Sequence, residues 1–338
     1  MKKTVIGIDI SKKTLDWCVI NGKDVVCVIN TMNDMDSIVS SMEAILKDYR
    51  IDIRDVLVCA EYTGRYIYPL TLACLKCGAD LWLESGYNIK CEARKERGKS
   101  DRADAFRIAE YGRKNQDDSR IYRMPAESIS NLRYLFSERE IYNSQRAALK
   151  AQIHDMQGYM PMSAYSECAA RELSVIRLLD SLIAEIDNKL EDIISSDPEL
   201  RRQYKLLQTI PGVGALCAAT LIAVTAGFTI FENGRELCCF AGLAPFSYSS
   251  GTSIRSRNRV SHRANHHLKA LLHLCAISSA TRAKDNPFAD YYRRKVDEGK
   301  NKMSVLNAVR AKMVLTAFAM IRDNTPFDKN HKLDLHVS

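Results

Sequence analysis

The stretch that decides the fold is Thr4-Val5-Ile6-Gly7-Ile8-Asp9-Ile10. It is a short, mostly apolar and β-branched run, which is typical of a buried strand, and it carries a carboxylate beside its end. A second run of this kind, Val56-Leu57-Val58-Cys59-Ala60-Glu61, also ends on a carboxylate. We therefore expect two strands that present Asp9 and Glu61 at their ends, where the side chains of neighbouring strands converge.

Further elements are predicted around these two runs. A hairpin with Asn21-Gly22 at its turn is expected over residues 17–29, and helices over 33–49, 65–77 and 101–114. A further strand is expected at residues 80–83. The order of strands and helices predicts an α/β domain over residues 1–122, with a mixed sheet and helices on its faces.

The middle of the chain has a different pattern. Apolar residues recur there in steps of three and four at Ile176, Leu179, Ile183, Ile186, Leu190 and Ile193. This spacing is typical of a coiled-coil seam. With a second helical stretch at residues 127–160 and a turn at Pro161, it predicts a coiled-coil helical hairpin over residues 123–200. The hairpin could pack on its own domain or join a second copy of the chain.

The third predicted part, residues 201–330, is mainly helical. It contains Ile210-Pro211-Gly212-Val213-Gly214, followed by an apolar helix at residues 215–225. The motif resembles the turn of a helix-hairpin-helix element, in which glycines let backbone N–H groups approach a DNA phosphate. Gly212 and Gly214 are therefore candidate nucleic-acid contacts, although an ordinary tight turn would have the same sequence pattern.

Composition narrows the class of protein. The chain has 338 residues and a formal net charge of +8, which suits a polyanionic partner without requiring one. Its 11 cysteines lie mostly in apolar runs, as expected of reduced, buried thiols. No signal peptide and no apolar run of about 18 residues is recognised, so we expect a cytoplasmic protein without a membrane partner.

Four carboxylates form the main candidate site. Asp9 and Glu61 lie at strand ends, and Asp101 and Asp104 share one face at the start of a helix. Together they could supply oxygen ligands for Mg²⁺ or Mn²⁺, and such ions support phosphodiester transfer. Each carboxylate alone would more often be a helix cap or a solvated strand end, so the prediction depends on the four together.

Basic residues accompany two candidate segments. Lys99 and Arg102 flank Asp101 and could attract phosphates. A second segment starts with Ser249-Ser250-Gly251 and carries the arginines Arg255, Arg257, Arg259 and Arg263. A serine in such a loop could attack phosphorus if a base or metal activates it. Most serines of this kind are ordinary loop residues, and charged runs are often only solvated surfaces.

Taken together, these motifs resemble the DEDD transposases of bacterial insertion sequences, the insertion-sequence one-ten family, which includes the Piv-type DNA invertases. The resemblance extends over nearly the whole chain and rests on the order and spacing of its stretches. They are Ile6-Gly7-Ile8-Asp9-Ile10-Ser11-Lys12, Ala60-Glu61-Tyr62-Thr63-Gly64, Lys99-Ser100-Asp101-Arg102-Ala103-Asp104-Ala105, Ile210-Pro211-Gly212-Val213-Gly214, and Ala241-Gly242-Leu243-Ala244-Pro245 through Ser250-Gly251.

The resemblance implies a RuvC-like RNase H fold, an inserted coiled coil and a C-terminal transposase domain. It implies that Asp9, Glu61, Asp101 and Asp104 bind divalent metal. It also implies that Ser250 joins covalently to DNA, that the chain forms a dimer or tetramer, and that a structured bridge RNA guides it.

One departure and one alternative remain. Where the family often has a Lys-Arg-Gly-Asn-like run after the serine, this chain has His262-Arg263-Ala264-Asn265. Ser249 adjoins Ser250, so the nucleophile could be either residue. The alternative function is a metal-dependent junction resolvase, which would hydrolyse DNA with water and need no serine.

Overall fold

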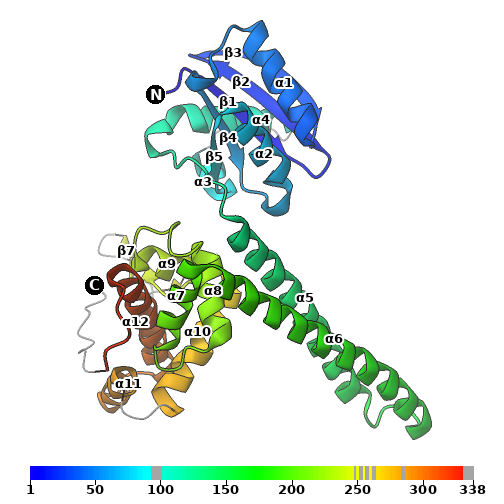
Figure 1. Ribbon diagram of the computed structural model, residues 1–338, viewed down its shortest axis with the longest axis vertical. Helices are drawn as coiled ribbons and strands as arrows, with labels where there is room; N and C mark the ends of the chain where they lie inside the picture. Colours follow the sequence, from blue (N-terminus) through cyan, green and yellow to red (C-terminus); the bar gives the residue numbers. More distant parts are fainter. Residues whose placement is uncertain are drawn as a thin grey trace. The chain divides into compact units, whose positions relative to one another are not determined.

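The structure is a computed structural model, and it describes residues 1–92, 101–246, 249–250, 254–255, 259–260, 264–282 and 286–329. The chain divides into two compact units, residues 1–124 and 125–338. Each unit is described by itself (Figure 1). The predicted boundaries at residues 122 and 200 stay a prediction.

The first unit is built on a five-stranded mixed sheet, as the sequence predicted. Its strands are β1 (Thr4–Ile10), β2 (Thr14–Asn21), β3 (Asp24–Met32), β4 (Val56–Glu61) and β5 (Asp80–Glu84). Their order is β3-β2-β1-β4-β5, with antiparallel pairing among the first three and parallel pairing among β1, β4 and β5. Asn21 pairs with Asp24, so the hairpin turn consists of Gly22 and Lys23, one residue later than predicted.

Helices cover both faces of this sheet. On one face, α1 (Met35–Asp48) and α2 (Tyr68–Cys77) pack against side chains such as Ile6 and Val58. On the other face, α3 (Gly86–Glu92) and α4 (Asp101–Lys114) pack against the alternate residues, such as Val5 and Leu57. This alternation follows from the two-residue repeat of a strand and explains why β1 and β4 carry apolar side chains on both faces. Short 3₁₀ helices lie at Ile53–Asp55, Gly64–Ile67 and Gln116–Asp118.

Gly7 lets α4 lie very close to the central strand. A Cβ atom at this position would lie only 2.2 Å from the backbone nitrogen of Ala109 and 2.5 Å from the carbonyl oxygen of Ala105. Both partners are alanines that face the sheet and are fully buried. The backbone of α4 therefore packs directly against β1, and this contact sets the distance between the helix and the sheet.

The second unit begins with a helical hairpin made of α5 (Glu127–Met156) and α6 (Met162–Ser196), which lie side by side (Figure 1). Arg139 pairs with Asp187 at 2.7 Å and Arg146 with Asp180 at 2.6 Å. Moving seven residues forward in one helix thus moves seven residues back in the other, so the two helices are antiparallel. The turn between them ends at Pro161, as predicted.

The predicted apolar seam of α6 is largely confirmed. Its members from Ile176 to Leu190 are buried, but the last buried position is Ile194, and Ile193 is only half-buried. Near its base, the hairpin shares one hydrophobic core with the helices that follow, through residues such as Leu132 and Ile186. The hairpin therefore packs on its own unit there. Its role as an oligomerising coiled coil stays a prediction.

The remainder of this unit is mainly helical, as predicted. Its helices are α7 (Pro198–Gln208), α8 (Ala215–Thr225), α9 (Gly234–Phe240), α10 (His266–Ile277), α11 (Pro287–Asp297) and α12 (Lys302–Asp323), with a π-helical turn at Ser278–Arg282. Two short antiparallel pairs lie between α9 and α10. They join β6 (Pro245–Phe246) to β9 (Arg259–Val260), and β7 (Ser249–Ser250) to β8 (Ile254–Arg255).

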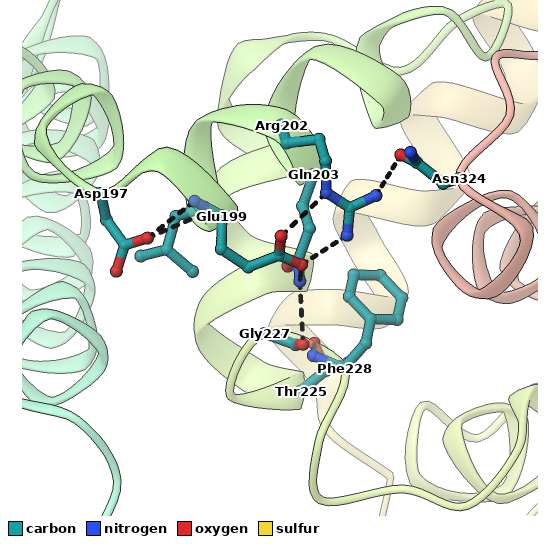
Figure 2. Close-up of polar contacts among 9 residues, drawn as sticks. Asp197, Glu199, Arg202, Gln203, Thr225, Gly227, Phe228 and Asn324 are labelled. Carbon is teal, nitrogen blue, oxygen red and sulfur yellow. Dashed lines mark hydrogen bonds and ion pairs between the residues drawn. The ribbon is translucent and has the colours of Figure 1, made fainter.

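Polar contacts tie α7 to its neighbours in this unit (Figure 2). Asp197 caps the helix by accepting hydrogen bonds from the backbone nitrogens of Glu199 and Leu200. Gln203 donates to the carbonyl oxygen of Gly227, just after α8. Arg202 pairs with Glu199 and also donates to Asn324, at the end of α12. The network therefore links α7 to the chain just after α8 and to the end of α12.

Within the described residues, α12 is the helix that is long and apolar enough to cross a membrane by length and composition. Much of it is buried in the core of its unit, where Val309, Met313 and Val314 contact other helices. A core helix of this kind passes the same test, so the finding is weak evidence for a membrane span.

Candidate active site

Two of the predicted carboxylates lie at adjacent strand ends. Asp9 is the second-last residue of β1, and Glu61 is the last residue of β4. These strands are parallel, and Ile8 lies opposite Ala60, one residue before each carboxylate. Asp9 and Glu61 therefore occupy neighbouring positions at the same edge of the sheet, as the sequence indicated.

The same alternation places both carboxylates on the face covered by α4. Val5 and Cys59 contact that side of the sheet, and Asp9 and Glu61 have the same parity on their strands. The intervening residues Ile8 and Ala60 contact the opposite layer. Strand geometry alone thus points both acidic side chains towards α4.

The close packing of α4 adds Asp104 to this face. Asp104 lies in the first turn of α4, next to Ala105, whose carbonyl oxygen lies over Gly7. It accepts a hydrogen bond of 2.6 Å from Nη1 of Arg107, one turn later. Asp101 is the first residue of the same helix, and its side chain lies outside the described part of the structure. A helix start that carries two carboxylates is therefore held beside the ends of β1 and β4.

Glu61 is closely confined by the segment that follows β5. A Cβ atom at Gly86 would lie 1.9 Å from Oε1 of Glu61, so any larger residue there would force this carboxylate to move. Nζ of Lys90 lies 3.8 Å from Oε2 of Glu61, and the Glu61 side chain is 27% exposed. Two of the acidic groups therefore have cationic neighbours, Lys90 and Arg107, which reduce the repulsion between the carboxylates.

The residues present fit a hard divalent cation by their chemistry. Carboxylate oxygens are the ligands that Mg²⁺ and Mn²⁺ prefer, and three of them come from elements that meet on one face of the sheet. Among the described residues, no group of three or more His, Cys, Asp or Glu side chains is yet gathered closely enough to hold an ion. The complete four-residue site stays a prediction, because the Asp101 side chain is part of it.

Sequence reasoning missed Glu84. This residue ends β5 and pairs with Glu61 across the parallel ladder, so it continues the row of carboxylates. It accepts hydrogen bonds from Asn88 at 3.0 Å and from the hydroxyl of Tyr111 at 3.4 Å. Burial, and then the negative charge of Glu84, raise the pKa of Tyr111 to about 12. The signal that found Glu61, a carboxylate ending an apolar strand, could also have found Glu84.

The predicted serine segment forms short strands where it is described. Ser250 pairs with Ile254 and Ser249 with Arg255, while Arg259 lies opposite Phe246. The backbone of this region is therefore a pair of small antiparallel ribbons. Nothing is described of the side chains of these strand residues or of Arg102, and Lys99, Gly251, Arg257 and Arg263 lie outside the described residues.

The two glycines of the predicted helix-hairpin-helix turn have different surroundings. Gly212 has φ +85°, and a Cβ atom there would lie 2.5 Å from the carbonyl oxygen of Cys275. An internal contact with α10 therefore explains this glycine. Gly214 is the N-cap residue of α8, and the described residues leave open space where its Cβ would be. A phosphate contact at Gly214 stays a prediction, and no described atom lies where it would obstruct such a contact.

Comparison with known proteins extends these findings. Residues 6–161 match the DEDD family of IS110 elements, described as "Transposase", and residues 204–293 match the "Transposase IS116/IS110/IS902 family". The pilin gene-inverting protein of Moraxella lacunata is 27% identical over 97% of this chain and 99% of its own length. Its counterpart in Moraxella bovis is 26% identical over the same shares.

Two further likenesses are partial. The transposase for insertion sequence element IS1111A of Coxiella burnetii is 32% identical over 33% of this chain and 32% of its own length. Among solved structures, RuvC of T. thermophilus in complex with a Holliday junction substrate matches 35% of this chain and 99% of its own. That match has 13% identity and a TM-score of 0.29.

Proposed function

Because the chain belongs to the IS110 family of DEDD transposases and Piv-type recombinases, we propose that it exchanges DNA strands through a divalent-metal site and a serine nucleophile. One observation supports this most directly. Asp9 and Glu61 end neighbouring parallel strands on the face where α4 carries Asp104. A structural role would not require three acidic side chains to share this face.

In this proposal the metal ligands are Asp9, Glu61, Asp101 and Asp104, and the ion is Mg²⁺ or Mn²⁺. When bound, such an ion polarises a phosphoryl oxygen and favours the ionised form of an attacking oxygen. Before binding, Arg107 donates a hydrogen bond to Asp104, and this contact holds the carboxylate in one orientation. Gly86 leaves the space that Glu61 occupies.

The proposed nucleophile is Ser250. Its hydroxyl oxygen forms a bond to phosphorus while a P–O bond of the DNA strand breaks. The serine proton passes to a base or water, and the departing DNA oxygen takes up a proton. Attack by the hydroxyl end of another strand then releases the serine and restores a phosphodiester. The number of phosphodiester bonds is conserved, so strands can be rejoined without ATP.

The remaining parts of the proposal come from the family. We propose that the first unit is a RuvC-like nuclease domain, that the chain works as a dimer or tetramer, and that a structured bridge RNA selects its DNA. Co-purification of a discrete RNA, and loss of strand exchange after ribonuclease treatment, would support RNA guidance. Full activity of RNA-free protein would exclude it.

The central test uses a plasmid that carries the DNA flanking the gene, with purified full-length protein. We expect Asp9→Asn and Asp104→Asn to abolish cleavage without lowering the melting temperature, since each replaces a carboxylate with a near-isosteric amide. Wild-type protein should stay attached to DNA after denaturation, whereas Ser250→Ala should not. The matched variant Ser249→Ala should retain the adduct.

Other results would contradict specific parts of the proposed mechanism. Full cleavage by Ser250→Ala, with no attached protein, would mean that water attacks and that the protein is a resolvase-like hydrolase. Loss of the adduct only in Ser249→Ala would identify Ser249, and not Ser250, as the nucleophile. Undiminished strand exchange by Asp9→Asn would exclude the metal site.

A further inference from the structure

An arginine without an ion-pair partner among the described residues lies in the core of the second unit. Arg310, in the middle of α12, is 7% exposed, and its Nε is buried without a hydrogen-bond partner. Within the described part of the chain, no carboxylate forms an ion pair with it. Burial lowers the pKa of its guanidinium. An uncompensated buried charge is strongly destabilising, so a group that normally offsets it is expected to bind there.

A second cation on the same helix shows the contrast. Lys312 is 3% exposed, but its Nζ lies 4.8 Å from the centre of the Tyr291 ring, where the face of the ring attracts a cation. Two residues along α12, Arg310 has no such contact among the described residues. The lack of a partner at Arg310 is therefore a local property and does not apply to every buried cation of this unit.

Two further basic side chains lie close to Arg310. Lys269 and His273 are one turn apart on α10, which packs against α12. The pKa of each is lowered, first by burial and then by the positive charge of Arg310. Nδ1 of His273 is also buried without a partner. The positive charge of Arg310 thus disfavours the protonated forms of Lys269 and His273, and an anion bound between them would favour those forms.

This basic cluster, defined by Lys269, His273 and Arg310, adjoins the points where the serine segment leaves the helices. Asn307, one turn before Arg310, donates a hydrogen bond of 2.8 Å to the carbonyl oxygen of Leu243. The backbone nitrogen of Asn265, one turn before Lys269, donates to the carbonyl oxygen of Phe240. The chain between these anchors includes Ser250. The cluster is therefore close to both ends of that segment.

From this arrangement we propose that Lys269, His273 and Arg310 bind a phosphate of the nucleic-acid backbone beside the serine segment. A guanidinium can donate two parallel hydrogen bonds to phosphoryl oxygens, and the two α10 side chains add donors from the other side. This inference rests on the proposed function, because it assigns these residues a positioning role for the DNA. The shared chemistry is a phosphoryl oxyanion, which free phosphate could also provide.

The main test is Arg310→Met, which removes the charge but keeps an apolar stem of similar length. Affinity for a fluorescein-labelled DNA duplex is measured by anisotropy across a potassium chloride series. We expect binding about tenfold or more weaker, since a hydrogen bond to a charged group is lost. The slope of log affinity against log salt should fall by about 0.9, the value for one phosphate contact.

The matched control is Arg322→Gln on the same helix. Arg322 is 76% exposed and already pairs with Asp323, so its loss should leave affinity and slope close to wild type. Arg310→Met should keep or raise the melting temperature, because an apolar side chain replaces an unpaired buried charge. Inorganic phosphate at constant ionic strength should stabilise the wild-type protein and should not stabilise Arg310→Met.

Several results would overturn the proposal. Wild-type affinity and slope in Arg310→Met would show that no backbone phosphate binds there. Stabilisation by phosphate without any change in DNA affinity would assign the site to free phosphate instead. If Arg310→Met unfolds, Lys269→Gln replaces it, and an unchanged salt slope then counts against the proposal. Since binding is measured without strand exchange, failure of the proposed recombination would leave this test intact.

Discussion

Replacing Gly7 with alanine tests how the candidate site is assembled. The added Cβ would lie 2.2 Å from the Ala109 nitrogen and 2.5 Å from the Ala105 oxygen, whereas ordinary contact begins near 3.4 Å. The helix α4 must therefore move away from β1 by roughly 1 Å. Overpacking of this kind costs about 1–3 kcal/mol of stability. A displacement of about 1 Å at Asp104 should lower the strand-cleavage rate by about 100-fold.

The assay compares cleavage rate with thermal stability, well below the melting temperature. Ile38→Val serves as the control, because Ile38 is fully buried on α1, on the opposite face of the sheet. It should lose about 0.5–1.5 kcal/mol of stability and keep its cleavage rate. A wild-type cleavage rate and melting temperature in Gly7→Ala would refute both the close packing of α4 and its role in placing Asp104.

Three further changes should have distinct effects. Gly86→Ala would bring a methyl group within 1.9 Å of Oε1 of Glu61, so cleavage should need more Mg²⁺, and an unchanged metal titration would contradict this. Asn265→Ala removes the cap that accepts from Leu268 and should cost about 1 kcal/mol in denaturant unfolding. The pKa of Tyr111 is raised to about 12, so this group contributes stability that is present below pH 10 and is lost as the pH rises towards 12. In melting curves measured across this pH range, Tyr111→Phe should remove that loss of stability.

The sequence predicted the first unit well because its signals are local. Apolar runs that end on Asp9 and Glu61 are complete within seven residues, and strand pairing brings such ends together without long-range information. The steps of three and four along α6 likewise specify one buried face. The coarse elements, and the place of two candidate site residues at strand ends, therefore followed from local patterns in the sequence.

Other features depend on tertiary contacts and could not be predicted. The phosphate contact at Gly212 stays a prediction, but the close approach of this glycine to the carbonyl oxygen of Cys275 could not be predicted. The buried position of Arg310 is invisible in sequence, because a single arginine in an apolar helix is equally consistent with an exposed face. Glu84 is different, because its position at the end of a strand could be predicted from the sequence. Its pairing with Glu61 then follows once the order of the strands in the sheet is known.

The position of β1 in the sheet has a consequence for how the protein is made. Thr4–Ile10 is synthesised before the other strands, yet it forms the middle strand and pairs with β2 on one side and β4 on the other. β2 follows at once, but β4 begins only at Val56. At roughly 5–20 residues per second, several seconds pass before that second partner leaves the ribosome. During this interval a strongly apolar strand edge is open to other nascent chains, so early chaperone contact would benefit this segment most.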